Sequence, residues 1–488
     1  MAESLTQKTF RGFFWQFGGT IFKTVIQLGV LFVLARLISK ADFGIVQSAL
    51  VVVGLSKLVS QMGVGPALVQ KETLTSLHIR SGATISLFLS IISFLIVFFS
   101  SGLLADFFKM PELTVVLKVV AVLFVLEGIT TVSQSLLLRE MRQKALAKID
   151  FLSYSVGYGL VAIVLAYYDF GLWSLIFAQL TQSTIKCISS YIVSRHSILP
   201  FFGKKEAKEL LYFGGGFTLA KLFSYLALQG DNIITGRYIG ADALGVYSRA
   251  YSLMVKPVSL IGDSIDKALF PAMSARQNQK NRLIEAFING ARLITFLALP
   301  ISCILILSAN ELIIVALGDK WVDAIIPFQI LTAGLLFRIG YKMGDCLCRA
   351  TGRIYSKAMR SLIYAICILL GSYIGSKWGI IGVAYGTLFA VIVNYILLIQ
   401  LSLSILGISW LYYLRRVFKE FLMILLSMII FYCIITFIRS FIESKILILL
   451  SSYSIFAIII LSILPFIIKR FDFLEILPFK NIIKKIKR

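Results

Sequence analysis

Residues 248–266 read SRAYSLMVKPVSLIGDSID, a stretch apolar enough to lie in a membrane yet marked by regularly spaced polar side chains. The polar residues recur at steps of three and four, which places them on one face of an α-helix. They are Arg249, Ser252, Lys256, Ser259, Asp263 and Asp266. At about 1.5 Å per residue this stripe runs about 25 Å, most of the hydrocarbon thickness of a bilayer. It predicts a membrane helix with one face turned toward water or toward polar partners.

The rest of the chain has the composition of a polytopic membrane protein. Of its 488 residues, 58% are hydrophobic and only 15% are charged. Apolar runs of about 20 residues, the length that a helix needs to cross hydrocarbon, recur from end to end. The net charge of +24 is expected in cytoplasmic loops, so nucleic acid is not an expected partner. The six cysteines and two histidines form no ligand motif, and neither a metal nor another cofactor is expected.

The apolar pattern predicts an all-α fold with fourteen transmembrane helices. Their expected ranges are 13–36, 43–65, 81–105, 113–137, 150–168, 172–194, 211–235, 243–268, 286–309, 322–346, 358–376, 380–404, 417–438 and 446–468. Lysine and arginine then set the orientation, with 29 on one side of the predicted membrane and 8 on the other. This bias places both termini in the cytoplasm and predicts that the basic tail lies on the inner leaflet.

Two halves of the chain share short motifs. The segment ARLISKADFGIVQSA (35–49) matches GRYIGADALGVYSRA (236–250), and GLWSLIFAQL (171–180) matches GIIGVAYGTL (379–388). Six predicted helices separate the copies, so the two repeats have the same orientation, as in transporters that bind substrate between the halves. The predicted parts are a six-helix bundle over 1–205, a second over 206–408, two extra helices over 409–470 and a basic cytoplasmic tail over 471–488.

Five cations lie on four equivalent helices of the two repeats. Four of them lie well inside their spans, namely Lys23, Lys57, Lys221 and Lys256, and Arg249 lies nearer the outer end of its span. A charge at the centre of a bilayer costs at least about 2.5–3.5 kcal/mol, so such residues face water or a partner. We therefore predict a water-filled central cavity, positive in its middle, that binds an anion. For any single lysine, a simple pair with a carboxylate or a carbonyl is the alternative.

Few carboxylates accompany these cations. Glu127, Asp263 and Asp266 are candidates for coupling or gating, although a hydrogen-bonded structural carboxyl is the alternative for Glu127. Arg338, Lys342 and Asp345 are expected to pair among themselves at the cytoplasmic end of a helix.

Two segments carry a family resemblance: FWQFGGTIFKTVIQLGVLFVLARLISKADFGIVQSA (14–49) and DNIITGRYIGADALGVYSRAYSL (231–253). They resemble Wzx-type polysaccharide flippases of the PST family, in the multidrug/oligosaccharidyl-lipid/polysaccharide (MOP) exporter superfamily, and the O-antigen and colanic-acid branch is the most similar. The resemblance covers about residues 8–405. It implies a MATE-like V-shaped pair of bundles in the bacterial cytoplasmic membrane, which exposes its site to one side of the membrane and then to the other.

The resemblance also implies the substrate, an oligosaccharide repeat unit linked to undecaprenyl pyrophosphate and destined for O-antigen, capsule or exopolysaccharide. The five cations would replace the hydration shell of the pyrophosphate while the prenyl tail stays in lipid. Aromatic and amide side chains are expected to meet the sugars, namely Trp15, Gln61, Tyr225 and Tyr251. A polysaccharide polymerase and a chain-length regulator are further expected partners.

Two related functions stay open at this point: a lipid II flippase for peptidoglycan synthesis, and an ion-coupled drug antiporter of the same superfamily. The antiporter is expected to have twelve spans and carboxylates in its cavity, whereas fourteen spans and cations are predicted here. A membrane enzyme is not expected, because no loop is long enough to hold a catalytic domain with paired carboxylates.

Overall fold

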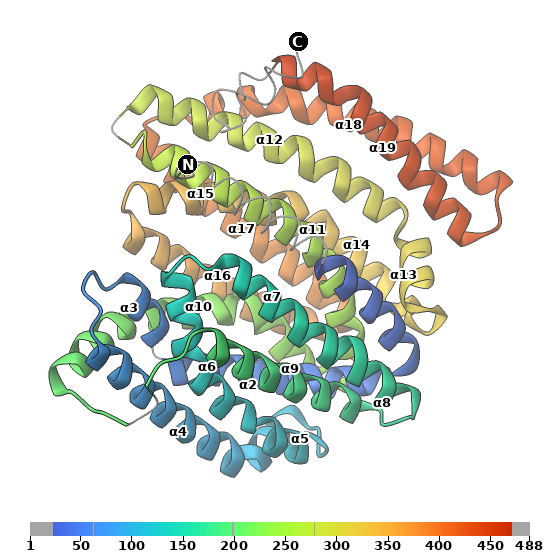
Figure 1. Cartoon of the computed structure of the whole chain (residues 1–488). Coiled ribbons are helices and arrows are strands. Elements are labelled where there is room, and N and C mark those ends of the chain that lie inside the picture. The colour runs from blue at the N-terminus through green and yellow to red at the C-terminus, as the bar shows by residue number, and fades with distance from the viewer. Residues whose placement is uncertain (1–22, 62, 198–199, 278, 471–488) are drawn as a thin grey trace, which may run out of the picture. The chain divides into compact units, whose positions relative to one another are not determined.

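The computed structural model describes residues 23–61, 63–197, 200–277 and 279–470. Within these residues the chain is helical and has no β-strand, as predicted (Figure 1). It divides into two compact units, residues 1–248 and 249–488. These units are defined by packing, and the repeat boundaries expected at 205 and 408 stay predictions.

The described part of the first unit begins within a helix that extends to residue 37. The helices that follow are α2 (Lys40–Gln61), α3 (Val64–Gln70), α4 (Ser76–Phe108), α5 (Leu113–Val120), α6 (Val122–Arg139), α7 (Gln143–Tyr154), the π-helix η1 (Ser155–Ala162), α8 (Ile163–Tyr167), α9 (Leu172–Val193) and α10 (Lys204–Tyr238). The long helix α11 (Ala241–Ser274) begins in this unit and continues into the second.

The second unit contains the remaining helices. They are α12 (Lys280–Leu307), α13 (Ala309–Leu317), the 3₁₀ helix η2 (Asp319–Ala324), α14 (Ile325–Ala333), α15 (Leu335–Ala350), α16 (Ile354–Gly375), the 3₁₀ helix η3 (Ser376–Trp378), α17 (Gly379–Leu406), α18 (Trp410–Phe441) and α19 (Lys445–Arg470). α18 packs on α12, and its residue Arg439 forms a two-contact ion pair with the buried Glu311 on α13. This pair attaches the first of the two extra helices to the unit.

Seven helical segments among the described residues are long and apolar enough to cross a membrane. They are Lys40–Leu58, Ser76–Phe108, Leu113–Arg139, Gln143–Tyr167, Lys280–Leu307, Asp319–Ala350 and Tyr355–Leu406. α9, α10 and α11 fall outside this set, and they carry Lys186, Lys221, Arg249 and Lys256 within their spans. Since polar stripes lower the apolar content of a helix, the number of spans is not set by this criterion, and fourteen stays a prediction.

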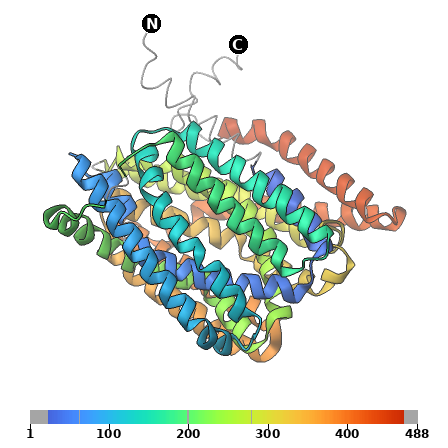
Figure 2. The same ribbon diagram turned by 60° about the horizontal axis from the view of Figure 1, so that its bottom comes forward.

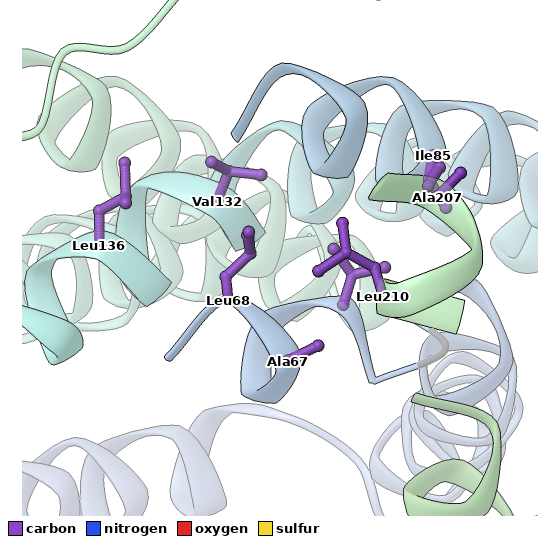
Figure 3. Close-up of a cluster of buried hydrophobic side chains, with 8 residues drawn as sticks. Ala67, Leu68, Ile85, Val132, Leu136, Ala207 and Leu210 are labelled. Carbon is purple, nitrogen blue, oxygen red and sulfur yellow. The ribbon is translucent and has the colours of Figure 1, made fainter. Parts of the chain in front are cut away.

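One end of the first unit is held together by a small apolar cluster. α3, α4, α6 and the start of α10 bury their side chains against one another there (Figure 3). The cluster comprises Val64, Ala67, Leu68, Ile85, Val132, Leu136, Ala207 and Leu210. Arg139 closes the same region, because its guanidinium donates hydrogen bonds to four carbonyl groups between Leu68 and Glu72, at the end of α3. The beginning of the second predicted repeat is thus docked on the first.

A polar contact lies beside this cluster. The carboxylate of Glu209 on α10 accepts a hydrogen bond from Lys71 and lies 3.3 Å from Nε2 of His78. Thr75, the N-cap of α4, contacts Nδ1 of the same histidine at 2.6 Å. Hydrogen bonds from Lys71 and His78 hold the pKa of Glu209 below its ordinary value. Glu209 precedes the predicted span at 211–235 and is exposed, so this contact is a surface latch for the start of α10.

The two matched segments meet at a reciprocal glycine contact. A Cβ atom at Gly44 would overlap the carbonyl group of Ala241, and a Cβ atom at Gly245 would overlap the carbonyl group of Lys40. Gly44 and Gly245 occupy the same position in the two copies, as do Lys40 and Ala241. Only glycine permits this approach, so the starts of α2 and α11 pack backbone against backbone.

Candidate functional site

Lys57, a predicted binding residue, is joined to Glu127, a predicted coupling residue. Nζ of Lys57 on α2 lies 2.6 Å from Oε1 of Glu127 on α6. The lysine side chain is 36% exposed and the glutamate side chain is 21% exposed. The acid comes from a helix outside the four that carry the predicted cations, which is why the repeat pattern alone did not show the pair. Pairing offsets part of the cost of holding both charges inside a membrane.

Lys23 has a carboxylate partner as well. Oδ2 of Asp150 on α7 lies 3.6 Å from Nζ of Lys23, and its Oδ1 lies 3.4 Å from Nζ of Lys186 on α9. Two lysines therefore share one aspartate, and the group keeps one positive charge in excess. Both carboxylate partners lie on helices other than the four that carry the predicted cations, Glu127 on α6 and Asp150 on α7.

Lys221 belongs to the same unit and lies on α10, which packs on α2. The ring of Tyr225 occupies the space beside Gly54, and its hydroxyl donates to the carbonyl of Val51 at 2.9 Å. α10 leads into α11, whose start adjoins the start of α2, so α10 and α2 run antiparallel. Lys221 precedes Tyr225 by one turn and Lys57 follows Gly54 by one turn, which places both lysines on the same side of this contact. Tyr225, expected to meet sugars, serves in this structure as a helix–helix contact.

We refer to Lys23, Lys57, Lys186 and Lys221, which all lie inside spans predicted from the sequence, as the four intramembrane lysines of the first unit. Among the described ion pairs, Lys23 and Lys186 share Asp150, and Lys57 pairs with Glu127. These three lysines exceed their two carboxylate partners by one positive charge. An excess of this kind, held within helices of a membrane protein, favours an anionic ligand over a cationic one.

In the second unit, the polar stripe of α11 lies beside α15. Arg338 is almost fully buried, with its guanidinium 5.1 Å from the ring centre of Tyr251 and Nη1 3.2 Å from the tyrosine hydroxyl. The Lys342 side chain fills the space that a side chain at position 262 would take, so Gly262 makes room for it. Arg249 and Lys256 lie on α11 in this region. The expectation that Arg338 belongs to a self-paired helix end was wrong, because this residue is an interior contact between α11 and α15.

The carboxylates of this seam have cationic neighbours. Asp266 pairs with Arg349, whose guanidinium also lies 4.9 Å from the ring centre of Phe270. Asp345 pairs with Arg349 and with Lys357 on α16. The side chain of Asp263 lies outside the described residues, as do Gln61, Trp15 and the basic tail. The gating roles of Asp263 and Asp266 stay predictions.

Three residues that form contacts in this region were not among the site residues predicted from the sequence. They are Asp150, Lys186 and Arg338. Lys186 did stand inside an apolar run, which is the same signal that marked Lys23 and Lys57. Asp150 stood at the edge of a predicted span, where a carboxylate is usually solvated. Arg338 carried no sequence signal that distinguishes a buried arginine from one at a helix end.

Residues 33–326, more than half of the chain, match the profile of a family described as polysaccharide biosynthesis protein. The chain belongs to this family. The family resemblance seen in the sequence is thereby confirmed. With seven candidate spans among its described residues, this family member is a multi-pass membrane protein.

Two curated relatives cover most of the chain. The teichuronic acid biosynthesis protein TuaB of Bacillus subtilis (strain 168) is 24% identical over 86% of this chain and 87% of its own length. The lipopolysaccharide biosynthesis protein WzxC of Escherichia coli (strain K12) is 23% identical over 88% of each chain. Their names assign these relatives to the biosynthesis of teichuronic acid and of lipopolysaccharide.

Solved structures share the fold of this family member at low sequence identity. The lipid II flippase MurJ in an inward closed conformation matches with a TM-score of 0.75, over 91% of this chain and 98% of its own, at 17% identity. An inward-facing multidrug resistance MATE family transporter of the MOP superfamily matches with a TM-score of 0.60, over 79% of this chain and 95% of its own, at 17% identity. The predicted fold class is confirmed at the level of an all-helical MOP-type fold.

Proposed function

We propose that this protein moves undecaprenyl-pyrophosphate-linked oligosaccharide repeat units across the bacterial cytoplasmic membrane, for the synthesis of O-antigen, capsule or exopolysaccharide. Family membership and the names of TuaB and WzxC support the polysaccharide assignment. The observation that carries the mechanism is the group of Lys23, Lys57 and Lys186, which keeps one positive charge in excess of its partners Glu127 and Asp150. A pyrophosphate cannot cross hydrocarbon without such groups, because its charge is strongly hydrated in water.

The ion pairs suggest how the empty and loaded states differ. In the proposed cycle the pyrophosphate takes the place of Glu127 at Lys57, and the place of Asp150 at Lys23 and Lys186. These carboxylates keep the lysines in position when no substrate is bound. Glu127, once released, is the proposed coupling residue.

The second unit has a parallel role in the proposal. Arg249 and Lys256 on α11 are proposed anion-binding residues, and Arg338 contacts Tyr251 on the same helix. Asp263 and Asp266 are proposed to act in gating, with Arg349 as the partner that Asp266 exchanges.

Transport is proposed to proceed by alternating access between two parallel six-helix repeats, within a set of fourteen spans whose termini are both cytoplasmic. The reciprocal contact of Gly44 and Gly245 supports the repeat, because equivalent residues make equivalent contacts. We place this contact at the outer ends of α2 and α11, where it closes the outward path. The repeat boundaries are those expected from the sequence, 1–205 and 206–408.

Two alternative functions can each be tested directly. A lipid II flippase would restore growth to cells that lack their own, and the MurJ likeness supports only the shared fold. A drug antiporter would bind organic cations, which the positive excess opposes. We place the protein among transporters rather than enzymes, and propose a polysaccharide polymerase and a chain-length regulator as its neighbours in the membrane.

The test is complementation of a strain that lacks this gene. Lys57→Ala and Lys221→Ala are expected to abolish surface polysaccharide while the protein stays in the membrane at the wild-type level. Lys118→Ala is the matched control, because Lys118 is a lysine of the same unit that lies on the face of the Phe98 ring instead. Full polysaccharide synthesis by both Lys57→Ala and Lys221→Ala, and by the double variant, would contradict the proposal.

A further inference from the structure

Two tyrosines of the first unit form a stacked pair beside α9. The rings of Tyr154 and Tyr158 are 5.3 Å apart and inclined by only 15°. The hydroxyl of Tyr158 donates a hydrogen bond of 2.8 Å to Oε1 of Gln179. Both rings are half-buried, and α7, η1 and α9 lie side by side in both views (Figures 1 and 2). We call Tyr154 and Tyr158 the tyrosine pair. Neither residue has a role in the function proposed above.

The backbone at this point is unusual. Residues 155–162 form a π-helix, a rare arrangement that often marks functional sites because it re-aims side chains at the expense of regular hydrogen bonding. Within it, a Cβ atom at Gly157 would lie 2.7 Å from the carbonyl oxygen of Ala178 and 2.8 Å from Cβ of Gln182. The glycine therefore allows η1 to approach α9 closely. This approach brings Tyr158 within reach of Gln179.

The tyrosine pair continues directly from the charged site. Asp150, which pairs with Lys23 and Lys186, lies one turn before Tyr154 on α7. On α9, Lys186 lies two turns beyond Gln179. Since Asp150 contacts Lys186 and Tyr158 contacts Gln179, the two helices run antiparallel and form one row of contacts. The contact between Asp150 and Lys186 lies at one end of this row, and the contact between Tyr158 and Gln179 lies at the other. From Asp150 to Tyr158 the row is about 12 Å long, at about 1.5 Å per residue.

The opposite side of the same helices is apolar. Leu160 and Val164 are 58% and 44% exposed, as expected for side chains that contact lipid tails. The tyrosine pair lies on the other side, packed toward α9, so it is not an anchor at the membrane surface.

We propose that Tyr154, Tyr158 and Gln179 form a subsite for a sugar ring, next to the lysines that bind the pyrophosphate. The proposal rests on the proposed function, since it assigns the glycan part of the same substrate. A sugar ring presents a face of C–H bonds to the negative face of an aromatic ring, and its hydroxyls at the ring edge bond to amides and carboxylates. The rings of the tyrosine pair would contact the C–H face of the sugar, and Gln179 and Asp150 would form hydrogen bonds with its hydroxyls.

The experiment measures binding to the purified full-length protein with two probes. One is farnesyl pyrophosphate, which has the charged group and no sugar. The other is the glycosylated lipid extracted from cells that lack this protein. Tyr154→Ala and Tyr158→Ala are each expected to weaken binding of the glycosylated lipid about tenfold, the effect of losing one aromatic contact, and to leave farnesyl pyrophosphate unchanged. Tyr158→Phe, which keeps the ring, is expected to weaken binding of the glycosylated lipid by less.

The matched control is Tyr167→Ala with Tyr168→Ala, a second contacting tyrosine pair at the end of α8, with both rings largely exposed. Unchanged binding of the glycosylated lipid in the Tyr154 and Tyr158 variants overturns the subsite. An equal loss for both probes also overturns it, because a merely structural pair would affect both. If the wild-type protein does not bind farnesyl pyrophosphate, the proposed function is wrong. This outcome differs from failure of the sugar subsite, which leaves farnesyl pyrophosphate binding intact in the wild-type protein.

Discussion

α2 and α11 begin alike and then differ in the contacts that their polar side chains make. Each starts at the reciprocal contact of Gly44 and Gly245, at equivalent positions of the two copies. Further along, α2 pairs Lys57 with a carboxylate from α6, whereas α11 places Tyr251 against a buried arginine from α15. The comparison teaches that the duplicated pattern specifies where the chain approaches closely and where cations lie. The carboxylate partner of Lys57 and the arginine partner of Tyr251 come from helices outside the matched segments.

The shared contact is the first place to break the comparison. Gly44→Val and Gly245→Val are each expected to abolish export, because a branched side chain cannot fit against the carbonyl group of the other copy. The measurement is surface polysaccharide normalised to the amount of protein in the membrane. The double variant is expected to be no worse than either single one, since all three remove the same contact. Export at the wild-type level by either single variant would show that this close approach is not required.

The contrasting partners give the second prediction. Arg338→Lys is expected to reduce export about tenfold, because lysine keeps the charge and loses the planar contact with Tyr251. Lys57→Arg, by contrast, is expected to retain most of the activity, since an arginine still pairs with Glu127. Export by both variants is compared at equal protein level. Equal export by Arg338→Lys and Lys57→Arg would show that the contact with Tyr251 does not require arginine, and would contradict the prediction.

A third prediction concerns the aspartate that two lysines share. Asp150→Asn is expected to lower export severalfold, because Lys23 and Lys186 then repel each other across a neutral side chain. Adding Lys186→Gln removes that repulsion but also one of the lysines proposed to bind the pyrophosphate, so it is expected to restore the melting temperature of the purified protein and not its export. Melting curves and export of the single and double variants check this coupling. A double variant that melts below both single ones would contradict it.

The smallest effect is expected at the surface latch of α10. Glu209→Gln is expected to lower the melting temperature by less than about 2 °C at neutral pH, as for other exposed ion pairs. The pKa of Glu209 is lowered in the folded state by Lys71 and His78, so the stabilisation is present above the ordinary pKa of a glutamate. It is lost as the pH falls through the lowered pKa. Melting curves of both proteins should therefore differ at neutral pH and converge in acid; a difference that grows in acid would contradict the sign.

The helix positions were largely predictable from apolar runs. A helix lies at each predicted span within the described residues, and the stripe on α11 occupies one long helix as expected. Interruptions were not predictable in the same way. The expected helix 113–137 breaks at Ala121, and the expected helix 150–168 begins at Gln143 and contains η1. Apolar periodicity reports which residues avoid water, but it does not report the hydrogen-bond register that a π-turn alters.

The site was predictable in its cations and not in its pairing. Lys23 and Lys57 were recognisable because a charge inside an apolar run is costly. Glu127 was recognised as unusual, but its contact with Lys57 depends on how α6 packs on α2. Arg338 shows the limit most clearly, since only tertiary packing distinguishes it from an arginine at a helix end.

Binding of farnesyl pyrophosphate to the purified full-length protein tests the central claim most directly, that the intramembrane lysines hold a pyrophosphate. Titration calorimetry of wild type, Lys57→Gln, Lys221→Gln and the control Lys118→Gln provides the measurement. We predict that the first two substitutions weaken binding at least about tenfold and that the control leaves it unchanged. Equal affinity in all four proteins would contradict the account.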